Sequence, residues 1–159
     1  MTNQAVVNFQ NEKAGLEKML ELLAAEQSAL LSSDLAALKS IVEDKNRTLA
    51  TITELTNIRH NDMERNGYPL TKDGVTGWLA HKLGSEDNSE NLKGDWDELL
   101  KITERNKEQN RINGLLISKH AMMNNQALKS LSPDHNTTYT YGPSGHENTK
   151  LRQRTLVVG

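Results

Sequence analysis

Apolar side chains recur at steps of three, four and seven residues over most of this 159-residue chain. That period places them on one side of a helix, whereas a half-buried strand needs apolar and polar residues to alternate. No alternating pattern lasts more than a few residues, apart from a short TLVV near the end. Only 35% of the residues are hydrophobic and 4% aromatic, which suits elongated helices with a narrow core. The sequence therefore predicts an all-α protein.

Turn and cap residues divide the periodic pattern into three long helices and one short one. Gly67 suits a left-handed C-cap, Gly84 ends the short helix, and Pro133 cannot continue the last one. Gly74 and Gly77 weaken the prediction of the short helix. We expect long helices over residues 3–31, 35–63 and 90–131, and a short one over 71–83. Brief turns between them favour an elongated antiparallel helical hairpin or bundle.

The sequence predicts two parts, a helical bundle over residues 1–131 and a flexible tail over residues 132–159. The tail is rich in Thr, Ser, Asn, Gly and Pro and has no helical period. Such a composition is typical of loosely ordered segments, because it offers little apolar surface to bury.

Charge and composition exclude several classes of function. The net charge is only −2, which gives no basic footprint for nucleic acid. The chain has no cysteine, so disulfides and thiolate metal sites are excluded. No apolar run approaches the roughly 20 residues that span a bilayer, and the N-terminus lacks the pattern of a signal peptide. We expect a soluble cytoplasmic protein without membrane insertion.

No residue pattern predicts catalysis or a metal site. The five histidines have no ligand spacing on a helix face, and most helical carboxylates, Glu12 among them, belong to solvated faces shared with lysines. One stretch, LAHKLGS, is similar to the A-H-x-L-K-G-S signature of histidine phosphotransfer domains, although the lysine before the glycine is missing. Phosphotransfer through His81 is therefore kept as an alternative function.

Three asparagines interrupt the apolar stripe of the last helix. Asn106, Asn110 and Asn113 follow Leu99 at helical spacing and lead to Ile117. Paired asparagines can fix the register between helices, and Gly114 is then expected to allow close backbone approach. The alternative is that the asparagines are exposed and that the core face comprises Ile112, Leu115 and Leu116. Periodicity alone leaves both interpretations open.

Several of these features together resemble the FlgN-type flagellar export chaperones. They are the leucine-patterned first helix, the segment SSDLAALKSIVEDKNRTLATITEL, a tryptophan-containing middle, the N-x-x-N-G-x-L-I pattern ending at Ile117, and the tail YTYGPSG. None of them is specific alone, but their order and spacing extend over most of the chain.

The resemblance implies a small cytoplasmic helical protein with no enzymatic activity and no cofactor. Members of that family bind the C-terminal segments of hook–filament junction (hook-associated) proteins. They prevent premature assembly of these clients and deliver them to the cytoplasmic domain of the flagellar type III export gate. A tyrosine in the tail docks on that domain, which implies Tyr141 next to Gly142, with Tyr139 as the alternative.

The resemblance also implies that the C-terminal third of the chain contacts the client. Methionine is flexible and polarizable and therefore suits an adaptable binding surface. The expected client-binding residues are Ile117, Met122, Met123, Leu128 and Leu131. The alternatives are that these side chains pack on the end of the bundle itself, or that the protein is a generic helical adaptor.

Overall fold

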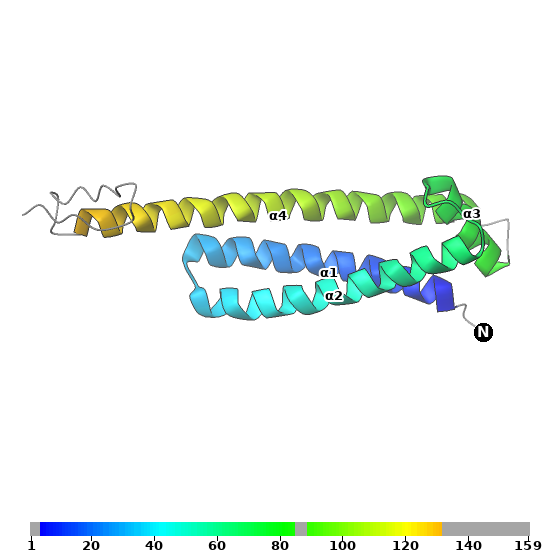
Figure 1. Ribbon diagram of the computed structural model, residues 1–159, viewed down its shortest axis with the longest axis horizontal. Coiled ribbons are helices and arrows are strands. Elements are labelled where there is room, and N and C mark those ends of the chain that lie inside the picture. The colour runs from blue at the N-terminus through cyan, green and yellow to red at the C-terminus, as the bar shows by residue number, and fades with distance from the viewer. Residues whose placement is uncertain (1–3, 85–88, 132–159) are drawn as a thin grey trace, which may run out of the picture. The chain divides into compact units, whose positions relative to one another are not determined.

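The computed structural model describes residues 4–84 and 89–131, and it is helical throughout these ranges apart from short turns (Figure 1). No strand occurs in the ranges described, so the all-α prediction is confirmed. The expected helix bounds differ from the observed ones by no more than a few residues. The helices are α1 (Gln4–Ser32), α2 (Leu35–Arg65), α3 (Lys72–Leu83) and α4 (Ser89–Leu131).

The chain divides into two compact units, Met1–Ala121 and Met122–Gly159. The first unit contains α1, α2, α3 and the part of α4 up to Ala121, and the second contains the last turns of α4. The tail expected over residues 132–159 lies outside the described residues. The predicted division into a bundle and a tail therefore stays a prediction.

Local cap chemistry sets the ends of α2 and α3 where the sequence indicates. Asp34 begins α2 by accepting a hydrogen bond from the backbone N–H of Ala37 at 3.0 Å. Thr71 begins α3 in the same way, since its hydroxyl accepts from the N–H of Gly74 at 3.2 Å. Gly67 follows the end of α2 with φ 73°, and Gly84 ends α3 with φ 65°. Both adopt the left-handed conformation that favours glycine.

The glycine at the start of α3 has a packing role that periodicity could not indicate. A Cβ atom at Gly74 would lie 1.9 Å from the carbonyl oxygen of Pro69, so no larger residue fits without a shift of backbone. This contact lets the first turn of α3 pack directly on the segment that follows α2. Gly74 therefore supports the short helix, although its low helix propensity weakened the prediction of that helix.

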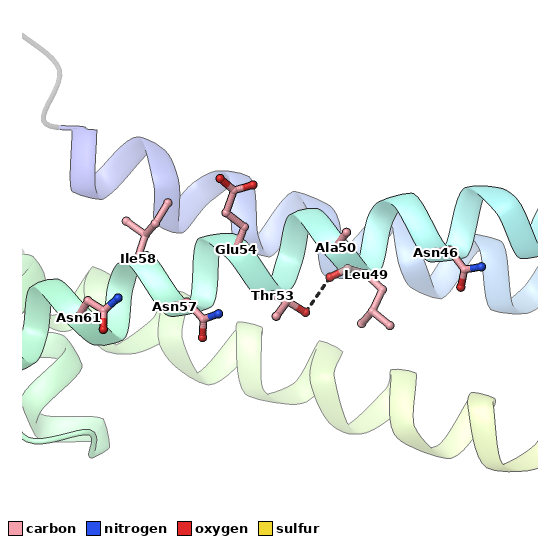
Figure 2. A pocket seen from close by; sticks show the side chains of 8 residues that line it. All are labelled: Asn46, Leu49, Ala50, Thr53, Glu54, Asn57, Ile58 and Asn61. Atoms are coloured by element: carbon pink, nitrogen blue, oxygen red, sulfur yellow. Dashed lines mark hydrogen bonds between the residues drawn. The ribbon is translucent and has the colours of Figure 1, made fainter.

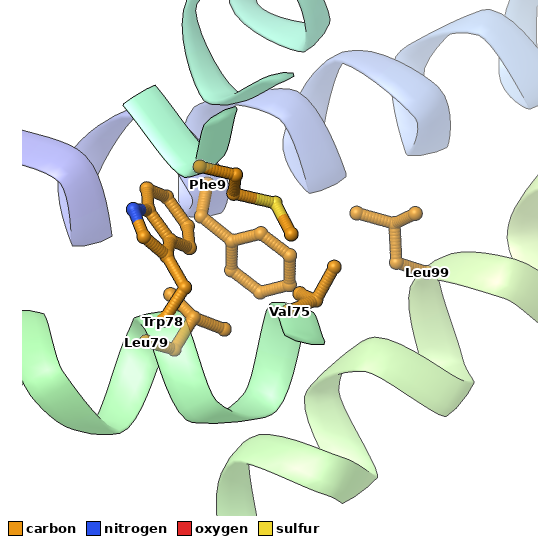
Figure 3. Close-up of a cluster of buried hydrophobic side chains, with 6 residues drawn as sticks. Phe9, Val75, Trp78, Leu79 and Leu99 are labelled. Carbon is orange, nitrogen blue, oxygen red and sulfur yellow. The ribbon is translucent and has the colours of Figure 1, made fainter. Parts of the chain in front are cut away.

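The apolar core of the first unit gathers where α3 meets the other helices. Phe9 comes from α1 and Leu99 from α4, and Trp78 and Leu79 of α3 lie against them (Figure 3). Trp78 is 1% exposed, and its indole N–H donates to the Asp62 carboxylate at 2.7 Å. Burying a large apolar side chain contributes about 1.5–3 kcal/mol. This cluster therefore holds α3 in place against α1 and α2.

A buried ion pair crosses between α1 and α2 next to this core. Glu12 and Arg59 are 3% and 6% exposed, and their two hydrogen bonds are both 2.9 Å long. The hydroxyl of Thr56 also donates to Glu12, and the Arg59 guanidinium lies 5.1 Å from the ring centroid of Trp96. The expectation that Glu12 belongs to a solvated face is wrong, because a guanidinium and a hydroxyl satisfy its carboxylate in the interior.

Candidate functional site

Two of the asparagines attach α4 to α1 through main-chain oxygens. Asn106 donates from Nδ2 to the carbonyl of Leu16 at 2.8 Å, and Asn113 donates to the carbonyl of Leu23, also at 2.8 Å. Each bond joins residues 90 positions apart, so α1 and α4 run parallel with a common register. Asn106 is 8% exposed and Asn113 1%, which places both amides in the interior.

Asn113 extends this attachment to a third helix. Its Nδ2 also donates to Glu26 Oε2 at 2.7 Å, and its Oδ1 accepts from Gln109 at 3.2 Å. Lys45 of α2 donates to both oxygens of Glu26, at 2.9 and 2.8 Å. Glu26, Lys45 and Asn113 therefore connect α1, α2 and α4, and we call these three residues the polar junction. Because its groups satisfy one another, the junction tolerates burial.

The remaining members of the predicted stripe are placed differently. Asn110 is exposed, since the seam between two helices repeats every seven residues and passes from Asn106 to Asn113. Gly114 is also exposed, and no heavy atom would lie within 4 Å of a Cβ atom there. The expected close backbone approach at Gly114 is therefore wrong, because this residue is turned about 100° away from Asn113.

The alternative core face, which comprises Ile112, Leu115 and Leu116, is only partly buried. Ile112 and Leu116 are half-buried, whereas Leu115 is 58% exposed. Two interior asparagines thus occupy the helix–helix seam, and the neighbouring apolar residues flank it.

The predicted client-binding residues are all exposed large apolar side chains. In the first unit, Ile117 is 50% exposed. In the second unit, Met122 and Met123 are 60% and 56% exposed, and Leu128 and Leu131 are 65% and 78% exposed. By helical spacing, Ile117, Leu128 and Leu131 continue the stripe that contains Asn106 and Asn113, while the methionines project from other sides of α4.

The same part of α4 carries no carboxylate. Glu108 is the last acidic residue of the helix, and its exposed ion pair with Arg111 has a distance of 2.8 Å. The hydrogen bond from Arg111 lowers the pKa of Glu108, so this carboxylate stays charged. Beyond it, α4 has only cationic or neutral side chains, among them Lys119 and Lys129. An exposed apolar surface in such surroundings suits a partner that carries acidic groups.

The other predicted site residues give no catalytic arrangement. Tyr139, Tyr141 and Gly142 lie outside the described residues. His81 is exposed in the last turn of α3, with its ring centroid 6.0 Å from that of Tyr68, and the next residue, Lys82, pairs with Asp62 at 2.8 Å. Within residues 4–84 and 89–131, no three acidic or histidine side chains are grouped so that they could hold a metal ion.

No helix in the described part of the chain is both long enough and apolar enough to cross a membrane.

Two buried carboxylates, Glu12 and Glu26, and their basic partners were not recognised from the sequence. Glu26 lies two heptads after Glu12, on the side of α1 that also carries Met19. This repeat is the only sequence signal that these carboxylates face the interior, and it is weak because exposed glutamates occur at the same spacing. Their basic partners, Lys45 and Arg59, lie far from these carboxylates in the sequence. They can be recognised only once α2 is packed against α1.

Comparison with known proteins agrees with this architecture. A family described as FlgN protein matches residues 1–149 of the chain. The flagella synthesis protein FlgN of Yersinia enterocolitica is 29% identical over 133 residues, which cover 82% of this chain and 80% of that protein. The protein of the same name from Proteus mirabilis is 29% identical over 149 residues, which cover 91% of this chain and 86% of the relative.

A solved structure shares the fold. The crystal structure of a flagella synthesis protein FlgN from Pseudomonas aeruginosa superimposes with a TM-score of 0.65 and covers 77% of this chain and 92% of that chain. At 19% sequence identity, this likeness concerns the fold alone. The family match, by contrast, extends over nearly the whole sequence and includes the segment with the asparagines. The chain therefore belongs to the FlgN family.

Proposed function

We propose that this protein is a cytoplasmic export chaperone for flagellar hook–filament junction proteins. It binds their C-terminal segments, prevents premature assembly, and delivers them to the type III export gate through Tyr141 of the tail. Membership of the FlgN family supports a role in flagellar synthesis. The role requires no enzymatic activity and no cofactor, since binding alone protects and delivers a client.

One observation carries the proposal for the binding surface. Asn106 and Asn113 are buried, yet Ile117, Leu128 and Leu131, which continue their stripe by helical spacing, are 50%, 65% and 78% exposed. A stripe of this kind is normally covered in a helical protein, because the free energy falls when another helix buries exposed apolar side chains. An amphipathic client helix would supply that cover, and Met122 and Met123 would adapt to its shape.

Pull-down of a hook–filament junction protein by the purified chain tests this surface. We expect Ile117→Asp combined with Leu128→Asp to weaken binding at least tenfold, because each change places a charge in an apolar contact. Leu100→Asp is the matched control: Leu100 lies on the same helix, is 41% exposed, and should leave binding unchanged. The helical content of all variants, measured by circular dichroism, should equal that of the wild type.

Two further comparisons separate the client from the gate. A client that lacks its C-terminal segment should not bind, and undiminished binding would contradict the proposed mode. Tyr141→Ala should retain the client and lose affinity for the cytoplasmic domain of the gate. If Tyr141→Ala instead lowered client binding as much as the α4 variant, the tail would have to be assigned to the client surface.

A further inference from the structure

Two Asn-Gly pairs occur in the chain, Asn66-Gly67 and Asn113-Gly114, and they lie in different surroundings. Asn66 is exposed at the C-terminal end of α2, whereas Asn113 is 1% exposed within α4. A glycine after an asparagine lets the next main-chain nitrogen reach the side-chain amide, because glycine has no Cβ atom in the way. We propose that Asn66 reacts spontaneously with water to give aspartate and isoaspartate, and that these products loosen α3 from α2.

Asparagine is chemically labile, and the reaction at this position needs only the chain and water. The main-chain nitrogen of Gly67 attacks Cγ of Asn66, its proton passes to water, and Nδ2 leaves as ammonia. The new bond closes a succinimide ring. Water then adds to one carbonyl carbon of the ring and breaks the bond of that carbon to the nitrogen. Opening at Cγ gives aspartate, and opening at the main-chain carbonyl gives isoaspartate, so the amide and water become a carboxylate and ammonium.

The end of α2 holds the reacting groups through a few exposed hydrogen bonds. Asn66 Nδ2 donates to the carbonyl of Asp62 at 2.6 Å and to its carboxylate at 3.3 Å. The main-chain N–H of Gly67 donates to the carbonyl of Glu64 at 3.1 Å. Because these bonds lie in the last turn of the helix, fraying of that turn frees both the amide and the nitrogen that attacks it.

Asn113 lacks this freedom. Its Nδ2 donates to the Leu23 carbonyl at 2.8 Å and to Glu26 of the polar junction at 2.7 Å. Its main chain lies well inside α4, where the N–H of Gly114 belongs to the helical hydrogen-bond ladder. The same reaction at Asn113 therefore requires α4 both to leave α1 and to unwind, which costs far more free energy than fraying of a helix end.

Exposure alone does not distinguish Asn66. Three other asparagines, Asn46, Asn57 and Asn61, project from the exposed side of α2, where they line a shallow hollow (Figure 2). They lie inside the helix, and the residues that follow them are arginine, isoleucine and aspartate, so a Cβ atom stands beside each main-chain nitrogen. These asparagines are therefore internal controls for a reaction that needs a helix end and a glycine as well as exposure.

The reaction at Asn66 alters the contacts that hold α3. Asp62 accepts hydrogen bonds from the Trp78 indole at 2.7 Å and from Lys82 at 2.8 Å. A carboxylate at position 66 has no N–H to donate to Asp62. It also adds a like charge beside Asp62, at the negative end of the α2 dipole. Each change destabilises the end of α2 to which α3 is bound.

Isoaspartate has a second effect, because its main chain passes through the side-chain carbons and is one carbon longer. Gly74 of α3 lies so close to the segment after α2 that a Cβ atom there would be 1.9 Å from the carbonyl oxygen of Pro69. A longer main chain at position 66 shifts this segment, and the tight contact leaves no space to absorb the shift.

Mass spectrometry of the full chain tests the site. Folded protein is incubated at mildly alkaline pH, which speeds the reaction, and is then digested with trypsin, with an unincubated sample as the background. Cleavage after arginine and lysine separates Asn66, Asn113 and Asn61 onto the peptides 66–72, 112–119 and 60–65. We expect the mass increase at Asn66 to appear roughly tenfold or more faster than at the other two. In guanidinium chloride the difference between Asn66 and Asn113 should disappear, because the fold then protects neither.

Two variants test the effect on α3. Asn66→Gln keeps an amide but closes the corresponding ring far more slowly. Its tryptophan fluorescence should therefore stay constant during an incubation that changes the fluorescence of the wild type. Asn66→Asp reproduces one product at once and should lower the urea midpoint. This decrease should be smaller when Asp62→Asn is also present, since the neighbouring like charge is then absent.

The outcomes are distinct. Conversion at Asn66 that is no faster than at Asn61 or Asn113 in the folded protein would overturn the proposed site. Conversion that leaves the fluorescence of the wild type unchanged, or a urea midpoint of Asn66→Asp equal to that of the wild type, would overturn the effect on α3. None of these measurements involves a client, so the proposed chaperone function is tested separately.

Discussion

Gly74 and Gly114 are both helical glycines, yet their surroundings differ completely. A Cβ atom at Gly74 would lie 1.9 Å from the Pro69 carbonyl oxygen, whereas a Cβ atom at Gly114 would meet nothing within 4 Å. The first glycine therefore permits a backbone contact, and the second only costs helix propensity. Gly74 is therefore required for steric reasons, whereas no neighbouring atom requires a glycine at position 114.

Gly74→Ala should lower the free energy of unfolding by about 2 kcal/mol or more, because the added methyl group forces α3 away from Pro69. Gly114→Ala should raise it by about 0.5–1 kcal/mol, since alanine is favoured in an open helical position. Urea denaturation followed by circular dichroism measures both changes. A Gly74→Ala variant as stable as the wild type would mean that the Pro69 segment moves away at little cost.

Asp62 binds the end of α3 to α2 through its carboxylate. It accepts hydrogen bonds from Lys82 at 2.8 Å and from the Trp78 indole at 2.7 Å. The hydrogen bond from Lys82, assisted by that from Trp78, lowers the pKa of Asp62 below its usual 3.8. A lowered pKa in the folded state means that the stabilisation is present above the unfolded pKa and disappears as the pH falls through the folded value.

Asp62→Asn should therefore lower stability near pH 7 by about 1 kcal/mol, a modest figure because the carboxylate is one-third exposed. The difference from the wild type should shrink as the pH falls from about 4, near the pKa of the unfolded state, down through the lowered pKa of Asp62 in the folded state. Urea midpoints read from tryptophan fluorescence at several pH values give the comparison. A difference that stayed constant down to the lowest pH would show that the charge of Asp62 contributes nothing.

At the scale of the element, α4 is attached to α1 by the amides of Asn106 and Asn113 in the part of the helix beyond Leu99. Asn113→Ala removes hydrogen bonds to Leu23 and Glu26 and leaves the Glu26 carboxylate dependent on Lys45. We expect a loss of about 2 kcal/mol in the free energy of unfolding. Asn110→Ala is the matched control: this asparagine is exposed, and its removal should change stability by less than about 0.5 kcal/mol. Equal effects in urea denaturation would contradict a special role for Asn113.

Helix number, bounds and caps were predictable from the sequence because they depend on local chemistry. Thr71, Gly67 and Gly84 act through neighbours only a few residues away. The interior position of Asn106 and Asn113 was one of two open interpretations, since burial of an asparagine is unfavourable unless its amide is hydrogen-bonded. The partners that satisfy these amides lie about 90 residues earlier in the chain and cannot be recognised from the sequence.

The long-range partners were not predictable. Glu12 pairs with Arg59 and Glu26 with Lys45. The two-heptad spacing of these carboxylates is too weak a signal to separate them from glutamates that stay in solvent. The contact of Gly74 with Pro69 depends on the path of the chain between α2 and α3, which local propensities do not determine. The site residues of the tail, Tyr139 and Tyr141, remain predictions because they lie outside the described residues.

At the scale of the molecule, the first unit combines two kinds of interior. Around Phe9, Trp78 and Leu99 the helices are held by apolar contacts, which are strong but largely non-directional. Further along α1, the polar junction holds the same helices through directional hydrogen bonds. The apolar cluster stabilises the unit by burying surface, and the amides fix how far α4 is advanced along α1.

The bonds from Asn106 and Asn113 end on main-chain oxygens of α1, 90 residues earlier in each case. A carbonyl oxygen is present whatever side chain its residue carries. Mutations that exchange one apolar side chain for another at Leu16 or Leu23 therefore leave both acceptors in place. Over evolutionary time, this allows α1 to diverge in sequence while the alignment of the two helices is retained.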